Sequence, residues 1–164
     1  MKPRSVAIVG ASETTQLGKV PDVSQTMLHA DAALNACADA GIKPQDIDGI
    51  ACAGESPVNL AHYLGITPKW VDATSVGGCS FMLHVRHAAA AINEGLCDTV
   101  IVTHGESGRS GVGRGGFGGG GGGTLSGQFE GTWGGMGPTT NFTLPVLRYL
   151  KETGTTLEQL ATVA

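Results

Sequence analysis

Apolar and polar residues alternate along the first hundred positions in two different spacings. Short runs rich in β-branched and small apolar residues predict strands at 5–9, 47–53, 69–73 and 99–103. Between these runs, apolar residues three or four positions apart predict helices at 25–40, 59–64 and from the turn at 75–78 to Gly95. Strands that alternate with helices of this length predict parallel pairing. The fold class is therefore α/β, with a mixed, mostly parallel sheet and covering helices.

The two long helices carry recognisable end signals. Ser24 is suited to cap the first helix and Gly41 to end it in a left-handed conformation, while Gly95 is placed to close the second. The apolar faces expected to be buried are Met27, Ala30, Leu34 and Cys37 on the first helix, and Met82, Val85, Ala89 and Ile92 on the second.

The composition changes after residue 104. The stretch 105–137 contains an unbroken glycine run, Gly118–Gly123, and predicts a long mobile loop that acts as a lid or a tether. A helix is expected at 141–152, with Pro145 in its first turn, and Thr155-x-x-Glu158 predicts a capping box that opens a last helix at 156–163. We therefore divide the chain into an α/β core, 1–104, and a glycine-rich loop with the beginning of a helical loop domain, 105–164.

Charge and composition narrow the class of partner. Charged residues make up only 15% of the chain and the formal net charge is −4, so the chain lacks the basic surface that nucleic acids require. No segment approaches the length of a membrane span, and the N-terminus lacks the features of a signal peptide. We expect a cytoplasmic protein whose partner is a small molecule or another protein.

Several familiar motifs are absent or incomplete. The four cysteines show no metal-binding or disulfide spacing, so no metal site is expected. Gly10 is the single glycine of the dinucleotide fingerprint that follows the first predicted strand. The arginine and glycine residues at 109–117 superficially resemble an RNA-binding segment, but one such patch in an acidic chain favours a flexible lid instead.

Two places could carry chemistry. Cys79 begins a helix, where unpaired backbone N–H groups and the helix dipole stabilise a thiolate, although a buried cysteine in a close-packed glycine turn is an equally good interpretation. His104 ends the last predicted strand beside Glu106, a position suited to acid/base or binding work. His84 and His87 could face one ligand, but a shared polar face is the favoured interpretation.

The order of short motifs resembles the thiolase superfamily, especially its sterol-carrier or lipid-transfer branch. The matching residues are Val6-Ala7-Ile8-Val9-Gly10; Ala38-Asp39-Ala40-Gly41-Ile42 with Asp46-Ile47-Asp48-Gly49; Gly77-Gly78-Cys79-Ser80; Ala90-Ala91-Ile92 with Gly95-Leu96; Gly105-Glu106-Ser107; and Thr153-Gly154-Thr155-Thr156 with Gln159-Leu160-Ala161. These matches fall along nearly the whole chain. The resemblance implies the N-terminal half of the fold, which stops before it is complete.

The resemblance also implies a site and its partners. Cys79 stands at or next to the nucleophile position, and Gly78, Ser80, His104 and Glu106 would bind substrate. No cofactor is implied beyond coenzyme A as part of an acyl-CoA substrate. The implied assembly is a homodimer that meets through the third strand, or a hetero-oligomer with a thiolase-like or OB-fold partner.

The sequence also departs from the thiolase pattern. The family's glycine three residues after the cysteine is absent, and counting back from Gly95 places the nucleophile position at Gly78. The Gly-Gly-x-Ser turn resembles steroid side-chain aldolases, which cleave a carbon–carbon bond in an acyl-CoA without that cysteine.

Three hypotheses follow. The first is an acyltransferase of lipid metabolism, similar to acetyl-CoA acetyltransferase, that forms an acyl-enzyme on Cys79. The second is an aldolase that cleaves a hydroxyacyl-CoA. The third is a non-catalytic binding or assembly subunit.

Overall fold

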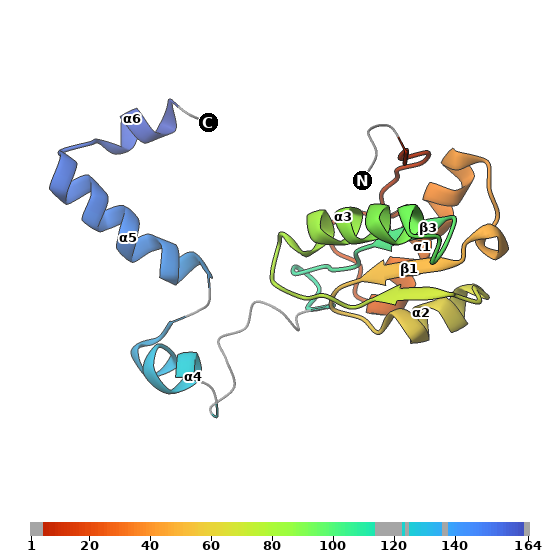
Figure 1. Cartoon of the computed structure of the whole chain (residues 1–164). Coiled ribbons are helices and arrows are strands. Elements are labelled where there is room, and N and C mark those ends of the chain that lie inside the picture. The colour runs from red at the N-terminus through yellow and green to blue at the C-terminus, as the bar shows by residue number, and fades with distance from the viewer. Residues whose placement is uncertain (1–4, 114–122, 124, 136–137, 163–164) are drawn as a thin grey trace. The chain divides into compact units, whose positions relative to one another are not determined.

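The computed structural model describes residues 5–113, 123, 125–135 and 138–162. The chain divides into two units, Met1–Gly116 and Phe117–Ala164 (Figure 1). No helix in the described ranges is long and apolar enough to cross a membrane.

The first unit is built on a parallel sheet of three strands. Strand β1 (Gly49–Cys52) lies between β2 (Trp70–Asp72) and β3 (Val100–Thr103), and Ile50 stands opposite Val71 on one side and Ile101 on the other. Every residue of β1 is buried, as expected of a central strand. The predicted α/β class and parallel pairing are confirmed.

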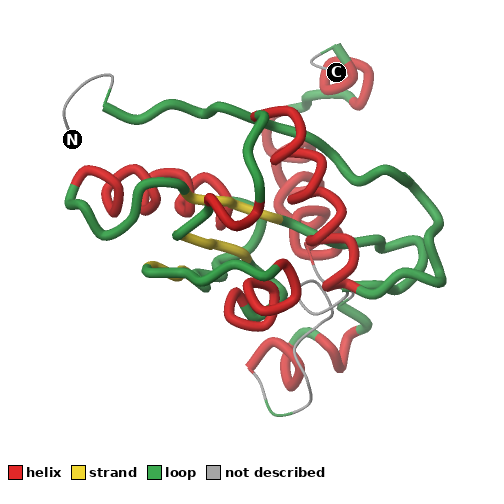
Figure 2. The backbone as a smooth tube through the Cα atoms, turned by 90° about the vertical axis from the view of Figure 1, so that its right-hand side faces the viewer, coloured by secondary structure: helices red, strands yellow, loops and turns green. Residues whose placement is uncertain are grey.

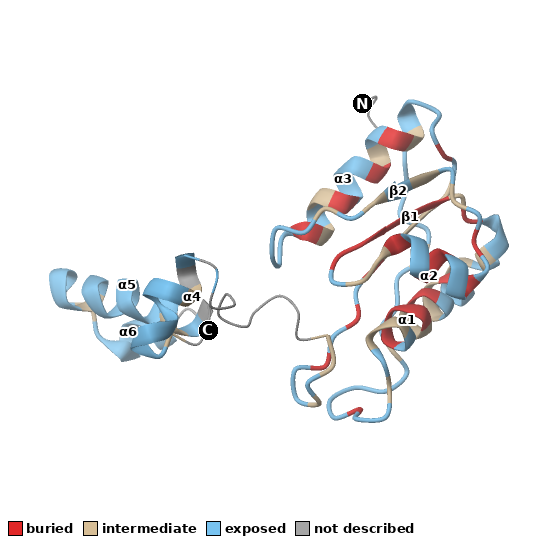
Figure 3. Cartoon of the chain, turned by 90° about the horizontal axis from the view of Figure 1, so that it is seen from below, coloured by how far each residue is buried: buried red, intermediate tan, exposed pale blue. Residues whose placement is uncertain are grey.

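Three helices cover this sheet. Helices α1 (Gln25–Ala40) and α2 (Pro57–Leu64) lie on one side of the strands and α3 (Ser80–Asn93) on the other (Figure 3). A short 3₁₀ turn, η1 (Pro44–Asp46), precedes β1. The predicted ends of α1 are confirmed: the Ser24 hydroxyl accepts the Met27 N–H at 3.2 Å, and Gly41 ends the helix at φ 70°.

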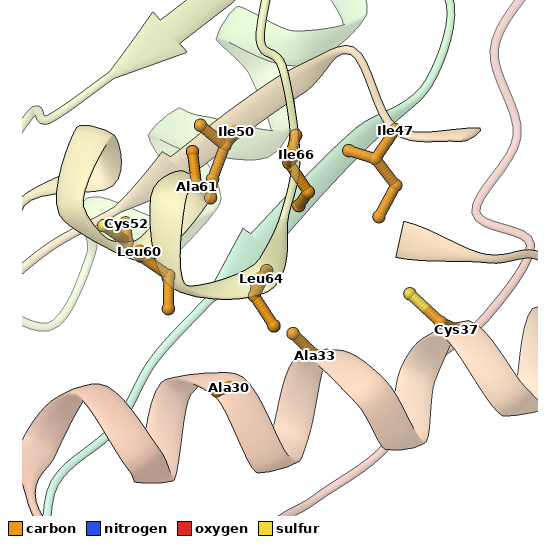
Figure 4. Packing of buried hydrophobic residues seen from close by; sticks show 10 residues of the cluster. All are labelled: Ala30, Ala33, Cys37, Ile47, Ile50, Cys52, Leu60, Ala61, Leu64 and Ile66. Atoms are coloured by element: carbon orange, nitrogen blue, oxygen red, sulfur yellow. The ribbon is translucent and has the colours of Figure 1, made fainter. Parts of the chain in front are cut away.

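The hydrophobic core lies between the sheet and helices α1 and α2 (Figure 4). It consists of small and medium-sized apolar side chains: Ala30, Ala33, Cys37, Ile47, Ile50, Cys52, Leu60, Ala61, Leu64 and Ile66. Small residues on α1 let the helix approach the strands closely. The amino ends of the strands are joined by Asp48, whose carboxylate accepts the Asp98 and Thr99 N–H groups at 2.9 and 2.8 Å.

The prediction of a strand at 5–9 is wrong. This segment is extended but runs as a loop (Figure 2), with Ile8 and Val9 exposed to 79% and 65%. A strand requires a hydrogen-bonded neighbour, and the three strands of the described sheet pair only with one another. Apolar composition alone predicted a strand without identifying its partner.

The predicted buried faces of the long helices are also partly wrong. Met27 and Leu34 of α1 are exposed, and the helix instead buries Leu28, His29, Ala30, Ala33 and Cys37. On α3 the buried residues are Ser80, His84, Ala88 and Ala91, whereas Met82 and Val85 are exposed to 74% and 41%. Close approach to the sheet selects small and hydrogen-bonded side chains over larger apolar ones.

The described residues of the second unit form helical segments without a buried core. They are α4 (Leu125–Phe129), η2 (Gly131–Trp133), α5 (Pro138–Thr153) and α6 (Leu157–Ala161). The loop expected at 105–137 therefore contains helical turns, while residues 114–122, with most of the predicted Gly118–Gly123 lid, lie outside the described residues. No described residue of this unit is buried, and Figure 3 shows its helices largely in the colour of exposed residues.

Two details of these helices differ from the sequence prediction. Helix α5 starts at Pro138, so Pro145 lies in its interior rather than in its first turn. A proline there removes one helical hydrogen bond, to the carbonyl four residues before it. The capping box is one residue later than predicted: the Thr156 hydroxyl accepts the Gln159 N–H, and the Gln159 side chain accepts the Thr156 N–H at 2.9 Å. Thr155 instead bonds the Thr153 hydroxyl.

Candidate active site at the carboxyl ends of the strands

Polar residues gather where the parallel strands end. Strand β1 leads to Gly54 and Glu55, and β3 leads directly to His104, Gly105 and Glu106. Because parallel strands present their carboxyl ends at one edge of the sheet, these residues lie at the same edge.

His104 and Glu106 form the most suitable acid/base pair at this edge. His104 Nε2 lies 3.6 Å from Glu106 Oε2, and the two side chains are 45% and 28% exposed. The ring of Phe81, from the first turn of α3, packs against His104 with centroids 4.5 Å apart. A partly exposed imidazole held between a carboxylate and an aromatic ring can accept a proton from a bound molecule.

The turn before α3 places the other predicted site residues. Gly77 takes a φ of 87°, which glycine adopts without strain. The Ser80 hydroxyl donates to the Gly77 carbonyl at 2.6 Å and accepts the Val76 N–H at 2.9 Å, so the hydroxyl closes the turn. Gly78 is exposed with open space around its α-carbon.

Cys79 stands at the cap position of α3, as its predicted place at a helix start requires. Its thiol is exposed and donates a long hydrogen bond to the Val76 carbonyl at 3.7 Å. Its side chain makes no capping hydrogen bond to the helix. The thiol is accessible at the start of the helix.

His84 and His87 bind different groups and do not converge on one ligand. His84 is fully buried and its Nε2 lies 2.8 Å from the Thr74 carbonyl, so Nε2 carries the proton. His87 Nδ1 lies 2.7 Å from Asp72 Oδ2 and the ring is half exposed. His84 therefore supports the loop that follows β2, and His87 supports the last residue of that strand.

Sequence reasoning missed His29, which α1 buries against the end of β3. Its Nδ1 lies 2.8 Å from the Thr103 hydroxyl, and its ring is 6.2 Å from that of His104. Burial, and then the nearby His104, lower the pKa of His29 to about 4, against the opposing effect of Glu55. His29 is therefore neutral near pH 7.

The glycine after His104 permits this packing. A Cβ at Gly105 would lie 2.6 Å from His29 Cδ2 and 2.7 Å from the His29 backbone nitrogen. A glycine directly after a predicted strand is the one sequence signal that could have indicated the contact.

Glu55 is the second residue missed by sequence reasoning. Its carboxylate accepts hydrogen bonds from the Thr26 hydroxyl and from the Ser56 N–H, the latter at 2.7 Å. These hydrogen bonds hold the pKa of Glu55 below its usual value, despite the opposing effect of burial. Glu55 is thus a fixed negative charge beside His29.

A separate open groove lies between β2 and α3, with a volume of about 410 Å³. It is lined by Trp70, Val71, Asp72, His87, Ala90, Ala91, Glu94 and Leu96. The groove follows the edge of β2 that pairs with no other described strand. Within the described ranges, no group of three or more His, Cys, Asp and Glu residues is arranged to hold a metal ion.

Two curated relatives and a solved structure are among the known proteins similar to this chain. The steroid side-chain-cleaving aldolase of Thermomonospora curvata is 32% identical over 67% of this chain and 29% of that protein. The 17-hydroxy-3-oxo-4-pregnene-20-carboxyl-CoA lyase of Mycobacterium tuberculosis is 33% identical over 65% of this chain and 28% of that protein. The solved Ltp2-ChsH2(DUF35) aldolase is 28% identical with a TM-score of 0.69, covering 90% of this chain and 37% of that chain. No protein-family model matches the chain.

The coverage of these matches shows how much of the relatives' length and fold this chain shares. The chain spans less than a third of the length of the curated relatives it matches. The structural match extends over nine-tenths of the chain, so the likeness to a thiolase-like, lipid-transfer type of fold is supported. Among the three hypotheses, the names of the relatives favour the aldolase over the acyltransferase.

Proposed function

We propose that the protein is an aldolase that cleaves a carbon–carbon bond in a 3-hydroxyacyl thioester of coenzyme A. The single observation that carries this proposal is the His104–Glu106 pair at the carboxyl edge, in a chain whose matched relatives are named as aldolases or lyases. One of those relatives is named for a hydroxylated, CoA-linked steroid acid. We extend that chemical class, a hydroxyl group near a CoA thioester, to this protein.

In the proposed reaction His104 accepts the proton of the substrate hydroxyl. The oxygen forms a carbonyl, the adjacent carbon–carbon bond breaks, and its electron pair moves onto the carbon beside the thioester as an enolate. That carbon then takes a proton, and the products are a carbonyl compound and a shorter acyl-CoA. Glu106, 3.6 Å from His104, stabilises the imidazolium formed between the two proton transfers.

Cys79 has no bond-forming role in this reaction. Its thiol donates to the turn carbonyl of Val76, which is consistent with a bystander in a glycine turn. Gly78 and Ser80 shape that turn. We propose that both residues line the substrate site beside Phe81.

We propose an oligomer rather than a lone subunit. The solved relative is named for two components, Ltp2 and ChsH2(DUF35), which supports a second subunit for this protein as well. A homodimer formed through the open edge of β2 is compatible with that arrangement, because the edge lies away from the His104 end of β3.

The test is a product assay with the intact protein and a panel of 3-hydroxyacyl-CoA esters. We expect equal amounts of carbonyl product and shortened acyl-CoA. His104→Ala should lower kcat about 10²- to 10⁴-fold, the usual contribution of a general base. His62→Ala, which removes an exposed histidine on α2, is the control and should retain wild-type kcat. Failure to form the carbonyl product, or full activity in His104→Ala, would refute the proposal.

A further inference from the structure

The unpartnered buried polar atoms of the first unit gather near the proposed site. In the described part of the chain, the buried side-chain atoms without a hydrogen-bond partner are Gln25 Nε2, His29 Nε2 and His84 Nδ1. Buried polar atoms are nearly always paired in folded proteins, so each exception requires an explanation. Two of the three are nitrogens of α1, one helical turn apart.

Gln25 and His29 project from the same face of α1 toward the ends of β1 and β3. A Cβ at Gly54 would lie 2.9 Å from Gln25 Nε2, and one at Gly113 would lie 3.1 Å from it. The same Gly113 position is 2.8 Å from Glu106 Cγ, which places the Gln25 amide close to the His104–Glu106 pair. His29 reaches the same region through its contact with Gly105 and its ring contact with His104.

Both nitrogens can act as hydrogen-bond donors. An amide nitrogen donates only, so Gln25 Nε2 has no other role. The Thr103 hydroxyl, 2.8 Å from His29 Nδ1, can donate to that nitrogen, and the proton of the neutral ring then resides on Nε2. The fully buried ring cannot readily take a second proton.

We propose that Gln25 and His29 form an oxyanion site that binds the thioester oxygen of the substrate and stabilises the enolate produced by cleavage. This inference rests on the proposed function and adds two substrate-binding residues to it. Neutral donors already fixed in a site with little water are the groups that stabilise a developing oxyanion most effectively.

The site is closed in this structure by a glycine turn. Gly113 covers the Gln25 amide with backbone alone, and its turn is held by the paired Ser107 and Val112 backbones at 2.9 and 3.1 Å. Displacement of this turn by the thioester uncovers the Gln25 amide without moving α1. Hydrogen bonds from the Thr26 hydroxyl and the Ser56 N–H hold the Glu55 carboxylate in place, and this carboxylate does not occupy either of the two donor nitrogens.

Two substitutions of His29 separate this role from a structural one. His29→Gln keeps a donor near the Nε2 position but loses the Nδ1 acceptor for Thr103. His29→Asn keeps a group that can bond Thr103 but removes the donor at Nε2. The oxyanion site predicts that kcat falls about 100-fold or more in His29→Asn, with little change in KM, and less than about 10-fold in His29→Gln. A purely structural role of His29, through its hydrogen bond with Thr103, predicts the reverse: the larger loss of kcat in His29→Gln.

A second readout separates this inference from the proposed function. Exchange of the α-hydrogens of propionyl-CoA in D2O requires the enolate but no cleavage, and it should follow the same order: wild type, His29→Gln, then His29→Asn. If the wild type exchanges in this order but cleaves no hydroxyacyl-CoA, the oxyanion site stands and the aldolase proposal fails. If cleavage and exchange are equal in the two variants, or follow the reverse order, the oxyanion site is overturned while the aldolase proposal stands. A wild type that does neither overturns both.

Discussion

At the scale of single residues, the buried His29 links the site to the pH dependence of folding. Its pKa is lowered to about 4 in the folded protein from an ordinary value of 6.5. Between these values the unfolded chain binds a proton that the folded protein excludes, so stability falls as pH falls through this window and is unaffected above it.

We predict that the free energy of unfolding decreases by up to about 3 kcal/mol between pH 6.5 and 4 because of His29. Urea denaturation of the first unit, in the intact protein, measures this dependence. His29→Gln carries no titrating group and should show a flatter profile in the same window. Parallel profiles for the two proteins would contradict the assignment. The carboxylates Asp48 and Asp72 also have lowered pKa values, but neither shift involves His29, so they act equally in both proteins.

Some residues of the candidate site could be predicted from the sequence, and others could not. His104 and Glu106 were predicted because a polar pair directly after a strand of β-branched residues stands at a functional edge. His29 was missed because a single histidine on an apolar helix face has no local signature. Its role depends on Thr103 and Gly105, more than seventy positions away, and only the fold brings them together.

At the scale of elements, glycines determine how closely α1 approaches the sheet. We predict that Gly105→Ala destabilises the first unit by about 2–4 kcal/mol, because the added Cβ meets the fixed backbone of α1 at His29. Gly108→Ala is the matched control: its Cβ meets no atom within 4 Å, so the change should stay within about 0.5 kcal/mol. Thermal or urea unfolding measures both, and equal stability of the two variants would be evidence against the close packing.

The elements themselves were largely predictable, because their signals are local. Caps and periodicity identified α1 and α3, and the β-branched run 99–103 identified β3. The prediction errors arose where an element's structure or buried face depends on the element packed beside it. The segment 5–9 has the composition of a strand but no strand beside it, and α3 buries its small residues rather than Met82 and Val85. Local pattern does not reveal which face of an element meets the sheet.

At the scale of the whole molecule, large apolar side chains remain exposed in both units. Met82 and Val85 lie on the outer face of α3, and Trp133 and Phe142 belong to the second unit, where no described residue is buried. Exposed apolar surface of this extent is typical of a protein that associates with other chains or segments. Few charges oppose such association, since charged residues are 15% of the chain.

We predict a dimer formed through the open edge of β2. Val71 is 45% exposed on this edge, and the adjacent groove is bordered by Trp70 and Leu96. Val71→Lys places like charges at the centre of a two-fold interface and should weaken the dimer about tenfold or more. Val58→Lys, on the exposed side of α2, should not. Sedimentation of both variants and the wild type measures the change, and a wild type that stays monomeric at micromolar concentration would exclude this dimer.

The most direct test of the account is to identify all products formed from one 3-hydroxyacyl-CoA in D2O by the wild type and by Cys79→Ala. Cleavage without a cysteine nucleophile predicts a carbonyl compound and a shortened acyl-CoA in equal amounts, at least one deuterium at the newly protonated carbon, and the same products at a similar rate from the variant. Release of free coenzyme A, with an acyl group attached to Cys79 and an inactive Cys79→Ala variant, would instead establish acyl transfer and contradict the aldolase.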